Sequence, residues 1–185
     1  MTPKETIVRH AYEQTAVRLA RLACFAETGE VGGYSYEVTF RQAQLATDDV
    51  LNVAIACRRL IDSLSLRNLS LTRRVSALSP DTLWADEKTK PEDQTLHDTL
   101  NKVIHSSFIE IFSFSYQMKD NIDFTSTLEM ITNRELYRLK PVLFFKSDRG
   151  PMSFCDLRDL CLALDEILDA SQEAAAEHKI FLGEF

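Results

Sequence analysis

The sequence is poor in glycine, which limits the kinds of enzyme it can encode. The chain has 185 residues and only five glycines. It contains none of the patterns GxxxxGK[ST], GxGxxG, HExxH, CxxC or GxSxG. Phosphate-cradling loops need glycines where the backbone approaches the ligand closely. We therefore expect no nucleotide-dependent enzyme of a common type and no cofactor.

Long apolar runs are also missing. No uninterrupted apolar segment approaches the roughly 20 residues that cross a bilayer. The first ten residues, MTPKETIVRH, lack the apolar core of a signal peptide. These observations predict a cytoplasmic protein with no membrane contact.

Cysteines are few, and their spacing does not favour a metal site. Only Cys155 and Cys161 are close in sequence, and their separation fits no usual zinc pattern. Free cysteine usually behaves as a small apolar residue. We expect all four cysteines to be buried, reduced thiols in apolar helical patterns: Cys24, Cys57, Cys155 and Cys161.

Positive charge is scarce, and the chain has a formal net charge of −7. This balance disfavours a protein that coats nucleic acid through bulk electrostatics. Residues 58 to 74 nevertheless hold five arginines against one aspartate. These arginines could contact phosphates, or they could pair with nearby carboxylates and keep the surface soluble. The candidate RNA-binding residues are Arg58, Arg59, Arg67, Arg73 and Arg74.

Apolar periodicity predicts three helices in the first two thirds of the chain. The first begins with a capping box, Thr2 and Glu5, and ends at Gly29. The segment GYSYEVTF, residues 33–40, alternates in polarity and suits an extended segment or an ordered loop. The second helix is predicted to start near Thr47, and the third to run from about Pro91 to His105. Residues 79–94 are predicted to form a flexible loop.

The last third changes to strand-like periodicity and then returns to a helix. Residues 106–119 and 140–146 are predicted strands, while 122–139 could be strand or helix. Ser153 and Asp156 are predicted to form the capping box of the last helix. The apolar tail is expected to pack on its own chain or on a second subunit. The fold class is mainly α, a single domain spanning 1–185 with about four long helices and a small antiparallel β-sheet before the C-terminal helix.

A candidate catalytic pair lies at LNKVIHS, residues 100–106, where Asn101 and His105 are one helical turn apart. Cleavage of RNA through its own 2′-hydroxyl needs a group that exchanges a proton near neutral pH, which histidine provides. It also needs a cation to stabilise the phosphorane. That cation would have to come from Arg58, Arg59 or another subunit. Alternatively, both residues are solvated and have no role.

This stretch resembles the motif of the HEPN superfamily, compact helical domains of which many are ribonucleases in toxin and antiviral systems. The family pattern is an arginine, a polar residue that is often asparagine, and a histidine. Asn101 and His105 match it, and Leu100 fills the arginine position. The segment AIACRRLIDSL, residues 54–64, resembles the helix that packs on the motif helix. The resemblance implies a homodimer with the motif at the interface.

Two functions follow as expectations. In the first, implied by the resemblance, the protein is non-catalytic or weakly active and associates with RNA in a bacterial stress or defence system. Any cleavage would be metal-independent, with His105 handling the proton and Asn101 orienting it. In the second, it is a non-enzymatic homo-oligomeric interaction protein with no nucleic-acid role. It would hold a protein partner through the loop around Trp84 or the C-terminal tail.

Overall fold

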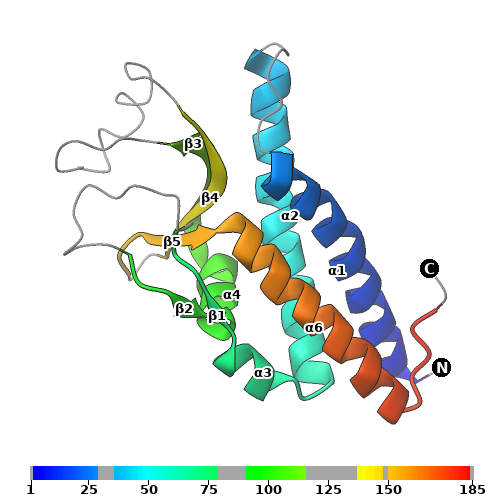
Figure 1. The fold of residues 1–185 in the computed structure, drawn as a ribbon. Coiled ribbons are helices and arrows are strands. Elements are labelled where there is room, and N and C mark those ends of the chain that lie inside the picture. The colour runs from blue at the N-terminus through cyan, green and yellow to red at the C-terminus, as the bar shows by residue number, and fades with distance from the viewer. Residues whose placement is uncertain (1, 29–35, 79–90, 116–136, 148–149, 184–185) are drawn as a thin grey trace.

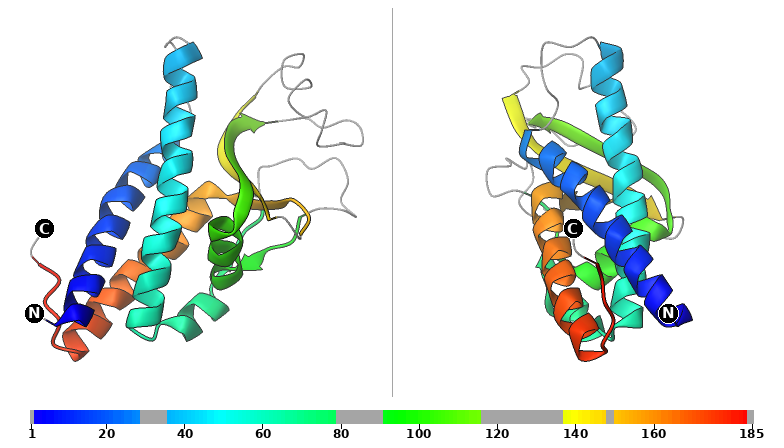
Figure 2. Two further views of the ribbon diagram at one scale, coloured as in Figure 1. Left: turned by 180° about the vertical axis from the view of Figure 1, so that it is seen from behind. Right: turned by 90° about the vertical axis from the view of Figure 1, so that its right-hand side faces the viewer.

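The computed structural model describes residues 2–28, 36–78, 91–115, 137–147 and 150–183. Three long helices pack side by side, and two short helices with the strands lie against one side of them (Figures 1 and 2). The helices are α1 (Pro3–Thr28), α2 (Tyr36–Ser63), α3 (Arg67–Thr72), α4 (Leu96–Ile104) and α6 (Leu157–Glu177). The predicted fold class, mainly α with a small antiparallel sheet before the C-terminal helix, is confirmed.

Helix α1 begins and ends where the sequence predicts. The backbone N–H of Glu5 donates to Thr2 Oγ1 at 3.3 Å, and the Glu5 carboxylate accepts from the Thr2 backbone, so the capping box is formed. The helix ends one residue before Gly29. Residues at helical spacing form its buried stripe: Val8, Ala11, Tyr12, Thr15, Leu19, Leu22 and Ala26.

Helix α2 begins earlier than predicted, and this corrects two expectations. Residues 36–40 are helical instead of extended, because no proline or glycine interrupts the chain between Tyr36 and Ser63. Asp49 therefore lies within the helix, well after its first turn. Its carboxylate is 6% exposed and accepts from Arg18 of α1 at 3.1 Å and from Arg21 of α1. This buried acceptor ties α1 to α2.

The N-terminal end of α2 extends beyond the end of α1 in all views (Figures 1 and 2). Its apolar side chains have few neighbours there: Val38 is 41% exposed and Leu45 is 61% exposed. The later part of α2 is the central core helix that its wide apolar arc predicts. The buried residues of that part are Val50, Val53, Ala54, Cys57, Leu60, Ile61 and Leu64.

The predicted third helix is shorter than expected at its start. Thr95 caps α4, since its Oγ1 accepts from the backbone N–H of Asp98 at 3.1 Å. Residues 94–95 form strand β2 (Gln94–Thr95), which pairs antiparallel with β1 (Arg74–Val75). The pairing ties the segment after α3 to the start of α4. Residues 79–90 of the predicted loop lie outside the described residues.

The larger sheet has the order β3–β4–β5, all antiparallel. One face carries Ile109, Ile111 and Phe145 into the main core. On the other face Phe144 and Phe154 stack edge to face, with ring centroids 4.8 Å apart. The predicted strand 106–119 is confirmed over 106–115, and the predicted strand 140–146 is confirmed. Residues 137–139 belong to β4, whereas 116–119 and 122–136 lie outside the described residues. The strands are β3 (Ser106–Ser115), β4 (Tyr137–Ser147) and β5 (Ser153–Asp156).

The start of α6 corrects the predicted capping box. Asp156 is the N-cap and accepts from the backbone N–H of Asp159 at 3.0 Å, while Ser153 belongs to strand β5. The segment 153–156 pairs with β4 because its alternate residues fill both faces of the sheet. Apolar residues at helical spacing form the buried stripe of α6: Leu157, Leu160, Cys161, Leu164, Ile167 and Leu168.

The N-terminus of α6 is also tied to the segment after α3. The Asp159 carboxylate accepts from the backbone N–H of Ser76 at 2.6 Å and from Arg73 at 2.8 Å. The backbone N–H of Asp156 donates to the carbonyl of Ser76 at 2.8 Å. Strand β1 is therefore held between α4 and α6.

Three of the four cysteines are buried as predicted, but Cys24 is exposed, and Cys155 lies in a strand instead of a helix. None takes part in a disulfide. Burial raises the pKa of the Cys57 thiol to about 12, so this thiol stays protonated. The C-terminal tail packs in part: Ile180 is buried and Phe181 is 68% exposed. Among the described residues, no helix has the length and apolar character to span a membrane.

The Asp49 interaction gives a stability prediction. Asp49→Ala removes the shared acceptor of Arg18 and Arg21, and we expect the free energy of unfolding to fall by about 2 kcal/mol. Both arginines keep access to water, which limits the loss. Urea unfolding followed by circular dichroism measures it. Asp48→Ala changes the exposed neighbour and should alter stability by less than about 0.5 kcal/mol. Equal effects of the two substitutions would contradict the assigned role of Asp49.

Candidate nucleic-acid interface

Among the described residues, the side chains of Asn101 and His105, the two predicted catalytic residues, make no hydrogen bond with each other. His105 is the C-cap residue of α4, and its backbone N–H donates to the carbonyl of Asn101 at 3.1 Å. Its side chain is exposed. The side chain of Asn101 instead accepts from Arg58 Nη1 of α2 at 2.7 Å. Leu100, at the arginine position of the HEPN pattern, is 1% exposed and belongs to the core.

Arg58 is the centre of a polar cluster that joins α2 to α4. Its Nε donates to Asp62 at 3.0 Å, one turn later in α2. Its Nη1 contacts His97 of α4 at 3.2 Å from Nε2 and 3.4 Å from Nδ1, in addition to Asn101. We call Arg58, Asp62, His97 and Asn101 the Arg58 junction. The Arg58 side chain is 26% exposed, so the junction reaches the surface.

The ring of His97 also contacts α3. Ser70 of α3 donates its hydroxyl hydrogen to the carbonyl of Arg67 at 2.8 Å. Ser70 Oγ also lies 3.4 Å from His97 Nδ1. In the tautomer with the proton on Nδ1, Ser70 Oγ accepts from Nδ1 and Nε2 accepts from Arg58 Nη1.

The environment of His97 keeps its imidazole neutral. Burial lowers its pKa below the ordinary value of 6.5, and the positive charges of Arg58 and Arg67 lower it further. His97 is 7% exposed. The effect of Arg67 means that arginines from α2 and α3 both act on the first turn of α4.

The five arginines predicted to bind RNA divide into two groups. Arg73 is held by two carboxylates of α6, with Nη2 at 2.8 Å from Asp159 and Nε at 2.9 Å from Glu166. It therefore has a structural role. The others contribute positive charge near α4: Arg58 at the junction, and Arg59, Arg67 and Arg74 with exposed side chains. Within the described ranges, no ion pair involves Arg59, Arg67 or Arg74.

Sequence reasoning missed His97, the histidine that actually contacts Arg58. It lies four residues before Asn101, a spacing that puts both side chains on one face of a helix. That spacing could have identified His97 from the sequence. The HEPN pattern instead selects His105, which follows Asn101 in the chain. The contact with Arg58 could not be read from sequence, because 39 residues separate the two.

The described part of the chain contains no group of three histidine, cysteine, aspartate or glutamate side chains that could hold a metal ion. Apart from Asp62, the side chains of the Arg58 junction are cationic or neutral. This set suits an anion better than a metal.

Comparison with known proteins gives no relative from which a role could be transferred. The chain matches no family model, no curated protein and no solved structure. The assignment of the site therefore depends on its geometry and charge.

The lowered pKa of His97 predicts a pH dependence of stability. The folded protein binds the His97 proton less tightly than the unfolded chain, so the unfolded chain gains a proton first as the pH falls. The stability that depends on neutral His97 is fully present above about pH 6.5 and decreases as pH falls from there toward the folded-state pKa. The free energy of unfolding, measured at pH 7.5 and 5.5, should fall more in the native protein than in His97→Gln.

His105→Gln is the control for this measurement, because the His105 side chain is exposed at the end of α4. Its free energy of unfolding should fall between pH 7.5 and pH 5.5 by as much as that of the native protein. If the free energy of unfolding of His97→Gln falls by the same amount, the assignment of His97 as a buried, neutral histidine is wrong.

Proposed function

We propose that the protein binds RNA through the Arg58 junction and the exposed arginines beside it, and that it cleaves RNA weakly or not at all. One observation carries the proposal. Arginines from two elements act on α4: Arg58 contacts His97 and Asn101, and the positive charge of Arg67 lowers the pKa of His97. In a chain of net charge −7, this is a local concentration of positive charge.

The geometry of Arg58 supports phosphate binding. Nε and Nη1 are held by Asp62, Asn101 and His97, which fixes the guanidinium plane. Among the described residues, Nη2 has no hydrogen-bond partner. A fixed guanidinium with a remaining donor suits a phosphate oxygen, and flexible, exposed arginines can contact neighbouring phosphates. Such contacts recognise the backbone and carry no sequence information.

The same geometry favours binding over cleavage. A general base needs a lone pair that faces the 2′-hydroxyl. Both ring nitrogens of His97 lie within 3.4 Å of Arg58 Nη1, and the ring is 7% exposed. His105 is accessible, but the described residues place no cation in contact with it. The choice of RNA as the nucleic acid follows from the resemblance to HEPN domains.

Arg67→Ala tests the proposed binding. Arg67 is exposed and has no ion-pair partner among the described residues, so its loss should leave stability unchanged. We expect a several-fold weaker affinity for a labelled single-stranded RNA. Removal of one phosphate contact should also reduce the slope of log K against log salt by about 0.7. Fluorescence anisotropy at several salt concentrations measures both quantities.

Arg41→Ala is the matched control. Arg41 is an exposed arginine of α2 near the opposite end of the helix from Arg58, and its side chain donates a hydrogen bond to Gln44 at 3.0 Å. It should bind RNA like the native protein. Equal losses for Arg67→Ala and Arg41→Ala would indicate binding by overall charge, which contradicts the assigned site.

A cleavage assay tests the absence of strong catalysis. The native protein, incubated with labelled RNA and without added metal, should leave the RNA intact while retaining it in a binding assay. Cleavage that disappears in His97→Ala or His105→Ala would contradict the proposal and identify a nuclease. The two variants would also show which histidine handles the proton.

The exposed end of α2 favours a second candidate function, a non-enzymatic interaction protein. Val38 and Leu45 are 41% and 61% exposed on a helix that extends beyond its neighbour. Apolar side chains presented on a helix are a common way to hold a protein partner. The RNA titration separates the two functions, since absence of RNA binding by the native protein favours the second.

A further inference from the structure

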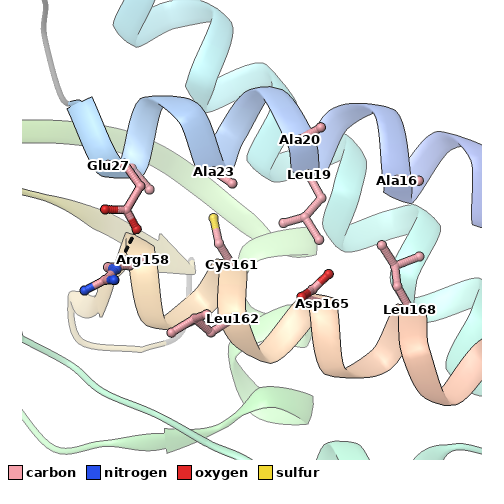
Figure 3. A pocket seen from close by; sticks show the side chains of 11 residues that line it. Ala16, Leu19, Ala20, Ala23, Glu27, Arg158, Cys161, Leu162, Asp165 and Leu168 are labelled. Atoms are coloured by element: carbon pink, nitrogen blue, oxygen red, sulfur yellow. Dashed lines mark hydrogen bonds and ion pairs between the residues drawn. The ribbon is translucent and has the colours of Figure 1, made fainter.

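The outer surface of the long helices contains a hollow that shares no residue with the Arg58 junction. It lies between α1 and α6 and has a volume of about 270 Å³. Figure 3 shows its walls: alanines of α1 face Cys161 and Leu168 of α6. The ion pair between Arg158 and Glu27, at 2.6 Å, closes one end. The alanines are Ala16, Ala20, Ala23 and Ala26.

Helix α6 presents a stripe of exposed residues beside this hollow. Arg158, Leu162, Asp165 and Asp169 follow one another at helical spacing, and all four are exposed. They lie opposite the buried stripe of the same helix. Leu162 is 51% exposed and lines the hollow, so a large apolar side chain meets water next to an alanine-lined concavity. The sign of the charge changes along the stripe, from positive before Leu162 to negative after it.

We propose that this face binds a second copy of the chain, with the two α6 helices antiparallel and crossing at Leu162. In this arrangement the two Leu162 side chains meet near the two-fold axis and fill the hollows. Arg158, four residues before Leu162, lies opposite Asp165 of the second copy, which is three residues after it. The two-fold axis repeats this ion pair, so the interface contains it twice.

The charges select the antiparallel direction. A parallel pair would place Arg158 against Arg158, Asp165 against Asp165 and Asp169 against Asp169, and like charges in contact are destabilising. Arg158 uses its Nε for Glu27, and the described residues provide no partner for its terminal nitrogens. These nitrogens can donate to a second carboxylate without breaking the existing pair. The occupant is therefore a copy of this chain, because its own α6 has the complementary order of charges.

The interface is independent of the proposed RNA site, since it shares no residue with the Arg58 junction. It also differs from the dimer implied by the HEPN resemblance, in which the motif residues lie at the interface. A dimer through α6 would combine two separate RNA sites in one particle. Failure of the dimer and failure of RNA binding are therefore distinguishable by separate measurements.

Sedimentation velocity of the full chain tests the proposal. At roughly 100 μM, above the micromolar dissociation constants of small interfaces, the native protein should sediment as a dimer of twice 21.1 kDa. Leu162→Asp should sediment as a monomer with an unchanged circular dichroism spectrum. A monomeric native protein at this concentration would overturn the proposal.

Charge reversal identifies the partner contacts. In Arg158→Glu, a glutamate faces Asp165 of the second copy at both positions. In Asp165→Arg, an arginine faces Arg158 of the second copy at both positions. Each variant alone should be monomeric. An equimolar mixture of the two should form a heterodimer. One of its two ion pairs is then the native pair, and the other is restored with the positions of its two charges exchanged.

The mixture also controls for misfolding, since an unfolded chain could not restore the complex. Glu13→Arg reverses a charge on an exposed position of α1 outside the hollow and should leave the native dimer intact. Dimers that persist in both single variants, or a mixture that stays monomeric, would overturn the antiparallel α6 interface.

Discussion

The guanidinium of Arg58 is the polar contact that joins α4 to the central helix. Arg58 projects from the central helix and is shared by a carboxylate of its own helix, an amide and an imidazole. A partly buried cation needs such acceptors, because an uncompensated charge in the interior is costly. Since α4 leads directly into β3, its position also sets where the antiparallel sheet begins. The Arg58 contact therefore acts together with the core packing of α4 on both the candidate site and the strands that follow it.

Much of the fold could be predicted because it follows from periodicity within single segments. The stripes from Val8 to Ala26 and from Leu157 to Leu168 are buried as their spacing indicates. The errors arose where two local patterns competed. Ser153 and Asp156 have the spacing of a capping box, but pairing with β4 uses the same residues as a strand. The alternation in residues 36–40 resembles a strand, although no breaker separates it from the helix that follows.

The candidate site could be predicted only in part. Arg58 and Asn101 were identified from the arginine-rich segment and from the LNKVIHS stretch, and the structure brings these two together. The place of His97 and the electrostatic effect of Arg67 on it depend on the packing of three helices, which no local pattern contains. Arg73 illustrates the opposite case, because its carboxylate partners lie 86 and 93 residues away, so its structural role could not be seen in sequence.

The bond between Ser76 and Asp159 has a consequence for the order of folding. It joins residues 83 positions apart, whereas the Arg18–Asp49 pair that ties α1 to α2 spans 31. Because closing a longer loop costs more chain entropy, contacts near in sequence form with less delay than distant ones. The α1–α2 hairpin can thus assemble while the chain is still emerging from the ribosome. The contacts of the β1 segment with α6 form only once α6 has been synthesised, so the α6 surface is completed at the end.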